Sequence, residues 1–328
     1  MNYCFIGVDI SKLWLDVAIC PNLEEGVVQN FQVTNCVKGI RSLIKRCRKM
    51  KSNLWFCFEH TGNYGLLLSH LLEDESLQYS AIPALEIKRS IGITRGKNDQ
   101  IDASRIAVYG ATHKHKLTES KLGSEVLLRV KTLLSHREQL SKQSRQWQNA
   151  LKSYQVSSEV TDLKDLVRNT KALITQLKKR IEKVEKQIEQ AILGEQELKK
   201  KYQQAVSVKG VGPLIAAYFL VYTNNFTAFD NPRKFNSFAG LAPFTHTSGT
   251  SIRGKTRTSN LRNKKMKALL FRGAFSASRS DCEMRRYYLR KTEEGKSHLC
   301  VINAIACKLV YRIFAVVNRT TPYVPLVR

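Results

Sequence analysis

Four carboxylates stand at places in the sequence from which they could together hold a divalent metal ion. Asp9 ends an apolar run at residues 3–9, and Glu59 closes a second one at residues 54–58. Asp99 and Asp102 are three residues apart at the expected start of a helix, which puts both on one face. Four like charges at short range repel unless a hard cation such as Mg²⁺ or Mn²⁺ neutralises them. The pattern therefore predicts metal-dependent phosphoryl-transfer chemistry.

Each of these acids also has an ordinary structural interpretation. Asp99 could cap a helix, Asp9 could lie in a turn, and Glu59 could pair with a Lys or Arg. Their joint placement at two strand ends and one helix start favours the metal site. Asp16 follows the start of another strand at residues 13–17, and we expect its side chain to point to solvent.

The apolar periodicity predicts the scaffold that positions the acids. Alternation at residues 3–9, 13–20 and 27–34 indicates three hairpin-linked strands, and a helical stretch follows at 37–50. A strand, a helix and a strand come next, up to residue 83. This order is that of an RNase H-like (RuvC-like) mixed sheet, whose fourth strand lies beside the first, although other small α+β domains share it. Such a sheet would bring Glu59 to Asp9.

Helical patterning dominates from about residue 100 to residue 201. Apolar residues recur in steps of three and four between Leu166 and Ala191, with charges between them, as in an antiparallel helical hairpin or a coiled coil between protomers. Glycine and proline then mark a new globular unit. We predict an α/β plus α protein with a catalytic domain at 1–120, a helical coiled-coil dimerisation region at 121–203 and a mainly helical C-terminal domain at 204–328.

The charge balance points to a polyanionic partner. The 328 residues include 54 Lys and Arg against 27 Asp and Glu, a formal net charge of +27. No acidic residue occurs between Asp230 and Asp281, and such a stretch favours a surface that tracks a nucleic-acid backbone. A ribosome-associated or heparin-binding protein without catalysis is the alternative that charge alone leaves open. The basic residues predicted to bind nucleic acid in this stretch are Arg253, Lys255, Arg257, Arg262, Lys264 and Lys265.

Two shorter features in the C-terminal region bear on phosphate chemistry. Gly210 and Gly212 form a glycine turn like that of helix-hairpin-helix modules, where backbone N–H groups meet a phosphate and Lys209 would add charge. An ordinary turn between helices is the alternative. Ser248 lies within the acid-free stretch and could attack a scissile phosphate, although a serine in a basic loop usually only hydrogen-bonds phosphate.

Other classes of protein are not favoured by the sequence. The eight cysteines form no C-x-x-C pair and several lie in apolar runs, which argues against zinc and disulfides. We expect no basic leader at the N-terminus and no apolar run near the ~20 residues that span a bilayer. A reducing cytoplasm is the expected location.

The chain resembles the insertion-sequence 110 transposases, a family with a DEDD tetrad that includes the Piv invertase. The resemblance covers nearly the whole chain and rests on four ordered blocks. They are Gly7-Val8-Asp9-Ile10-Ser11-Lys12 followed by Asp16-Val17-Ala18, Glu59-His60-Thr61-Gly62, Lys97-Asn98-Asp99-Gln100-Ile101-Asp102-Ala103, and Phe238 to Pro243 followed by Ser248-Gly249, Arg253-Gly254-Lys255 and a basic helix.

This resemblance implies a bacterial, nucleoid-associated DNA recombinase. Asp9, Glu59, Asp99 and Asp102 would bind Mg²⁺ or Mn²⁺, and Ser248 would form a covalent phosphoserine link to DNA. A noncoding bridge RNA would pair with donor and target DNA. The working form would be a dimer or a dimer of dimers, joined through the helix at 166–191.

The sequence also departs from the family, because many relatives have a glycine pair where Thr258-Ser259-Asn260 follows Arg257. Ser251 therefore stays a lesser candidate nucleophile. Two other functions remain open: a metal-dependent nuclease, such as a junction resolvase, that uses water instead of Ser248, and an RNA-binding scaffold without catalysis.

Overall fold

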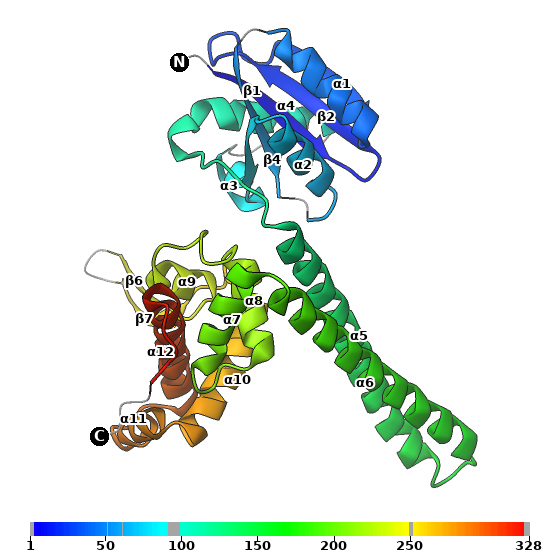
Figure 1. The fold of residues 1–328 in the computed structure, drawn as a ribbon, viewed down its shortest axis with the longest axis vertical. Helices are drawn as coiled ribbons and strands as arrows, with labels where there is room; N and C mark the ends of the chain where they lie inside the picture. The colour runs from blue at the N-terminus through cyan, green and yellow to red at the C-terminus, as the bar shows by residue number, and fades with distance from the viewer. Residues whose placement is uncertain (1–2, 51, 61, 91–98, 249–251, 325–328) are drawn as a thin grey trace. The chain divides into compact units, whose positions relative to one another are not determined.

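The computed structural model describes residues 3–50, 52–60, 62–90, 99–248 and 252–324. The chain divides into two compact units, Met1–Leu122 and Gly123–Arg328 (Figure 1). The first unit is a mixed α/β domain and the second is mainly helical. The predicted fold class, α/β plus α, is thus confirmed.

A five-stranded sheet forms the centre of unit 1. Its strands are β1 (Tyr3–Ile10), β2 (Trp14–Cys20), β3 (Gln29–Thr34), β4 (Asn53–Glu59) and β5 (Gln78–Ile82), in the order β3-β2-β1-β4-β5. The first three pair antiparallel, whereas β4 runs parallel to β1 and β5 runs parallel to β4. This is the RNase H-like order that the periodicity predicts.

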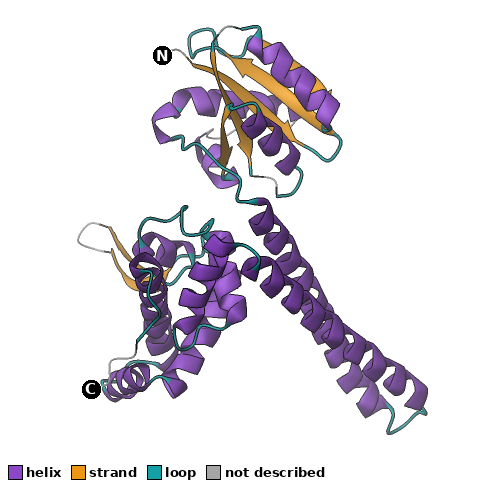
Figure 2. Cartoon of the chain, viewed as in Figure 1, coloured by secondary structure: helices purple, strands orange, loops and turns teal. Residues whose placement is uncertain are grey.

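Helices cover both faces of this sheet (Figure 2). On one face α1 (Val37–Arg48) and α2 (Leu66–Asp74) bury side chains such as Ile40 and Leu72 against Ile6 and Val8. On the other face α3 (Ala84–Ser90) and α4 (Asp99–Thr112) pack on residues such as Phe5 and Cys57. Because both faces are covered, the central strands are buried on both sides.

Unit 2 begins with two long helices that run antiparallel beside each other, α5 (Glu125–Ser157) and α6 (Lys164–Leu193) (Figure 1). Leu177, Val184 and Ile188 of the apolar stripe are buried within this unit, in one cluster with Leu134 and Leu140 of α5. The stripe therefore makes the intramolecular hairpin that the sequence left as one of two alternatives. Leu166, at its start, is 41% exposed.

The rest of unit 2 is a helical bundle with one hairpin of strands. Aromatic residues from three helices, Phe219, Phe235 and Phe314, pack against one another in its core. Its elements are α7 (Gln196–Ser207), α8 (Pro213–Tyr222), α9 (Pro232–Phe238), β6 (Pro243–Ser248), β7 (Ile252–Thr258), α10 (Lys264–Ser280), α11 (Cys282–Glu293) and α12 (His298–Arg319).

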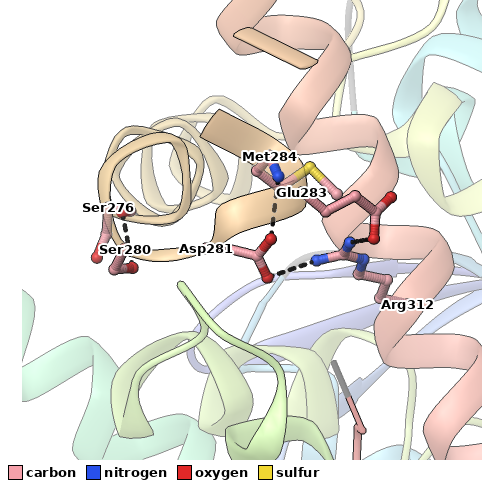
Figure 3. A network of polar contacts seen from close by, with 6 residues as sticks. All are labelled: Ser276, Ser280, Asp281, Glu283, Met284 and Arg312. Atoms are coloured by element: carbon pink, nitrogen blue, oxygen red, sulfur yellow. Dashed lines mark hydrogen bonds and ion pairs between the residues drawn. The ribbon is translucent and has the colours of Figure 1, made fainter. Parts of the chain in front are cut away.

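A buried ion pair joins three of these helices. Asp281 accepts a hydrogen bond from the backbone N–H of Met284 at 3.0 Å and so caps α11. The Arg312 guanidinium of α12 lies 3.0 Å from Asp281 and 2.5 Å from Glu283 (Figure 3). Asp281 is 3% exposed and the Arg312 side chain 12%, so this network ties α12 to the junction of α10 and α11.

Helix α12 corrects one expectation from the sequence. It has the length and apolar composition of a membrane span, although no such run was expected. Its residues Val301, Ile305 and Leu309 are nevertheless buried in the unit 2 core. The buried core helix of a globular domain can have the same length and apolar composition, so α12 is only weak evidence for a membrane span.

Candidate active site

The polar side chains of the site form a row across the sheet of unit 1. Asp9 on β1 pairs with Asp16 on β2, and Asp16 pairs with Gln32 on β3. On the other side the parallel register of β1 and β4 reaches Val8 and Phe58, and one step further sets Asp9 beside Glu59. Residues at paired positions point to the same face, so the row faces α4.

A glycine lets α4 approach this row closely. A Cβ on Gly7 would overlap the carbonyl oxygen of Ala103 and the backbone N–H of Ala107. Gly7 and Asp9 are two residues apart on β1 and thus share a face. The close approach brings the first turn of α4, with Asp99 and Asp102, over the end of the strand that carries Asp9.

The pKa of Asp9 reflects its burial and the charges of other acids close to it. Burial is the largest of the effects that raise the pKa of the Asp9 carboxyl from 3.8 to about 6, and the charges of Asp99, Asp102 and Asp16 contribute to the same shift. A hydrogen bond from the backbone of Ile10 opposes that shift. Asp9 is therefore a desolvated carboxylate surrounded by other carboxylates, which is an environment that binding of a cation would relieve.

The acids do not form a closed metal-binding cluster by themselves. Within the described residues no group of three or more His, Cys, Asp or Glu has the spacing of metal ligands. Asp102 instead pairs with Arg105, whose Nη1 lies 2.9 Å from its Oδ1. Asp99 is exposed, and Glu59 is half-buried at the end of β4. The charges of Asp99 and Asp102 thus act on Asp9, while Asp102 is bound to a cationic side chain.

Asp16 is not directed to solvent, and that expectation was wrong. It is 4% exposed and both of its oxygens accept a hydrogen bond from the Gln32 side-chain amide, each at 3.1 Å. Its strand is buried on both faces. The sequence therefore shows no alternation of polar and apolar residues there that would indicate the direction of the Asp16 side chain. Its neighbours two and four positions on, Ala18 and Cys20, lie on the same face and were the available signal.

In unit 2, Ser248 is the last residue of β6 and pairs with Ile252 of β7. It thus stands at the turn end of the hairpin. The side chains of Ser248, Arg253 and Lys255 lie outside what the structure describes, as does Ser251 altogether. Near the other end of the hairpin a pocket of about 710 Å³ is lined by Phe244, Arg257 and Ser237, among others.

The predicted basic residues differ in how their charges are used. Lys264 and Arg257 are exposed. Arg262 donates to the Ser259 carbonyl at 2.8 Å and so braces its own loop. Lys265 forms an ion pair with Glu138. Lys267, which the sequence did not single out, donates to the Gly240 carbonyl at 2.8 Å and to the Thr258 hydroxyl at 3.1 Å, and so anchors the base of the hairpin.

The two glycines of the turn between α7 and α8 play different parts. Gly210 has a φ of +91°, and a Cβ there would lie 2.6 Å from the Gly273 carbonyl oxygen of α10. Gly212 caps α8 with a φ of −85°, and a Cβ there would meet nothing within 4 Å. Lys209 is exposed beside them. Close packing on α10 thus accounts for Gly210, while Gly212 and Lys209 have no packing role in the described residues.

Comparison with known proteins gives matches along almost the whole chain. One family model described as a transposase, of the DEDD IS110 type, matches residues 6–155. A second, the transposase IS116/IS110/IS902 family, matches residues 202–289. A pilin gene-inverting protein of Moraxella bovis is 30% identical over 332 residues, which cover 98% of each chain.

Two further matches are shorter. An uncharacterised 43.6 kDa protein of insertion element IS110 from Streptomyces coelicolor is 35% identical over 117 residues, or 36% of this chain and 29% of its own. A solved structure of T. thermophilus RuvC in complex with a Holliday junction substrate aligns with 37% of this chain and all of its own, at 10% identity and a TM-score of 0.29.

The matches define a DNA transposase or recombinase, and the first unit of this chain is built on a mixed sheet. The chain belongs to the IS116/IS110/IS902 transposase family.

Proposed function

We propose that this chain cuts and rejoins DNA at the carboxylate row of unit 1, with a divalent metal ion, and that Ser248 forms a transient covalent link to the DNA. The observation that carries the proposal is the environment of Asp9. Its carboxyl is desolvated at a strand end and lies in the field of Asp99 and Asp102, which belong to a different element. Such a convergence of acids costs stability unless a cation binds there.

The residues present fit a hard divalent cation. Carboxylate oxygens are the ligands that Mg²⁺ and Mn²⁺ prefer, and Asp9, Glu59, Asp99 and Asp102 supply them. Asp102 must exchange its contact with Arg105 for the metal, at least in part. A bound ion would supply positive charge to activate the attacking oxygen and to stabilise the leaving oxygen.

The covalent step is a phosphoryl transfer that conserves the number of phosphodiester bonds. The Ser248 oxygen forms a bond to phosphorus, the bond from phosphorus to a deoxyribose oxygen breaks, and the leaving oxygen takes up a proton as the serine hydroxyl loses one. A second deoxyribose hydroxyl then displaces the serine. The bond energy is therefore kept for rejoining, which suits a recombinase better than hydrolysis does.

The assembly we propose contains donor and target DNA and a noncoding guide RNA. The formal charge of +27 suits several polyanions at once, and the family resemblance supplies the guide. The assignment of Lys209, Gly210, Gly212, Arg253, Lys255, Arg257, Arg262, Lys264 and Lys265 to nucleic-acid contacts is part of this proposal. The proposal also includes Mg²⁺ as the ion and a dimer or tetramer as the working form. It further includes a bacterial cytoplasmic location near the nucleoid, and domain limits at residues 120 and 203.

The test is a trapping experiment with a Ser248→Ala variant. Full-length protein is mixed with end-labelled element DNA, its RNA and Mg²⁺, denatured, and separated by size. We expect a labelled protein–DNA adduct from the wild type and from Ser251→Ala, and neither adduct nor cleavage from Ser248→Ala. Cleavage by Ser248→Ala that leaves a free DNA end would instead identify a nuclease of the junction-resolving kind.

A further inference from the structure

Asp16 lies directly opposite Asp9 on neighbouring antiparallel strands. Like charges at such a position destabilise a sheet, because the two side chains start only about 5 Å apart. Asp16 is 4% exposed, so water screens it little. Its charge also raises the pKa of Asp9. The fold thus keeps a buried carboxylate, Asp16, beside the half-buried Asp9 at a cost in stability.

The hydrogen-bonding partner of Asp16 is neutral. The Gln32 side-chain amide donates to both carboxylate oxygens at 3.1 Å, and no ion pair within 4.0 Å involves Asp16 in the part of the chain that the structure describes. A buried carboxylate is normally paired with a cation or bound to a metal. A neutral amide holds the carboxylate in place but does not balance its charge.

A purely structural role does not explain an aspartate at this place. An asparagine would fill the same volume and could still accept a hydrogen bond from Gln32 without repelling Asp9. The aspartate is the better residue only if something positive binds close to Asp9. Strand register places Asp9, Asp16 and Gln32 in one row on the face covered by α4, so Asp16 faces the same side as the acids of the candidate site.

We propose that Asp16 is a positioning residue of the metal centre. Held by Gln32, it acts through Asp9 and adds negative charge that raises the affinity of the site for a divalent cation. This inference rests on the proposed function, because it needs a cation at the DEDD acids. It adds a residue outside that tetrad and gives the Gln32 amide a role.

The experiment measures Mn²⁺ binding by calorimetric titration of the full-length chain, and thermal unfolding in EDTA and in Mn²⁺. Asp16→Asn is expected to weaken Mn²⁺ binding by at least about tenfold, because loss of one nearby charge predicts about that much even at the dielectric constant of water, and the buried Asp16 is screened less. In EDTA its Tm should equal or exceed that of the wild type, because repulsion of Asp9 is relieved. Glu24→Gln removes an exposed carboxylate after β2 and is expected to change neither quantity.

A second variant keeps the charge and removes its partner. Gln32→Leu leaves Asp16 buried without the amide, so its Tm in EDTA should fall and Mn²⁺ should raise that Tm by more than it raises the wild-type Tm. The Gln32→Leu variant tests the proposed role of Asp16 if Asp16→Asn does not fold.

The inference is overturned if Asp16→Asn binds Mn²⁺ like the wild type, or if Mn²⁺ stabilises Gln32→Leu no more than the wild type. If the wild type itself binds no Mn²⁺ and Asp9→Asn is indistinguishable from it, the metal centre of the proposed function fails, and the role of Asp16 fails with it.

Discussion

Gly7 of β1 and Ala103 of α4 touch through their backbones, and there is no room between them for a Cβ. This contact sets the distance between the strand that ends in Asp9 and the helix that begins with Asp99. A helix held further off would carry Asp99 and Asp102 away from Asp9. The geometry of the candidate site therefore depends on a position that carries no functional group.

We expect Gly7→Ala to damage both stability and metal binding. The added methyl group would push α4 off the sheet, at a cost of about 1–3 kcal/mol in unfolding free energy. Mn²⁺ affinity should fall with it. Chemical denaturation and titration measure the two effects. Gly212→Ala is the matched control, since a Cβ there meets nothing within 4 Å and φ is −85°; equal losses in both variants would contradict this account.

The raised pKa of Asp9 predicts how stability and metal binding depend on pH. In the folded protein this carboxyl titrates near 6 instead of 3.8, because of burial and nearby acids. The metal-free fold thus holds a proton there more tightly than the unfolded chain, and this stabilisation is lost as the pH rises from about 4 to about 6.

Mn²⁺ must displace that proton, so its affinity is expected to rise with pH up to about 6 and then level off. Calorimetric titration across this range measures the effect. Asp9→Asn should lose it, together with most of the binding. An affinity that stays constant between about pH 5 and about pH 7 in the wild type would show that Asp9 does not titrate as its surroundings indicate.

Removal of the buried Arg312 is expected to destabilise unit 2 severely. Arg312→Met keeps the apolar stem but leaves the nearly buried Asp281 without its cation (Figure 3), and loss of one partner of such a pair costs about 3–5 kcal/mol. Thermal unfolding should show the loss. Arg168→Met is the control, because its pair with Asp165 is 78% and 82% exposed and worth about 1 kcal/mol or less.

Arg257 tests the nucleic-acid surface of unit 2. Its exposed guanidinium lines the pocket that also contains Phe244. If it contacts a phosphate, Arg257→Ala weakens DNA binding at all sequences and lowers the slope of log affinity against log salt by about one. Fluorescence anisotropy at several salt concentrations measures this slope. Lys234→Ala, which removes a lysine paired with Asp230, is expected to change the slope less.

The sequence predicted the fold of unit 1 well, because the apolar periodicity there indicates both the strands and their order. The strand order of unit 1 follows from the apolar alternation and from the parallel placement of β4 beside β1. The stripe from Leu166 to Ala191 predicted a helix but not its partner, because α5 presents its apolar residues irregularly over 33 residues. Both an internal hairpin and a contact between protomers satisfied the pattern of α6 alone.

The site was predicted less completely, for physical reasons. Asp9 and Glu59 end buried strands, and this placement alone marks them. Asp16 lies inside a strand that is buried on both faces, so local polarity does not show its direction. Ion pairs such as Lys265 with Glu138 join residues over a hundred positions apart, and no local pattern predicts them. The charge of Lys265 is therefore partly used within unit 2.

The most direct test of the central claim maps the residues around the metal. Fe²⁺ in place of Mg²⁺, with ascorbate and peroxide, produces hydroxyl radicals that cut the peptide chain near the bound ion, and the fragments are identified by mass spectrometry. We predict cuts near Asp9, near Glu59 and at Asp99 to Asp102, all suppressed by excess Mg²⁺ and absent from Asp9→Asn. Cuts in only one of these three segments, or cuts that persist in Asp9→Asn, would contradict a shared metal site.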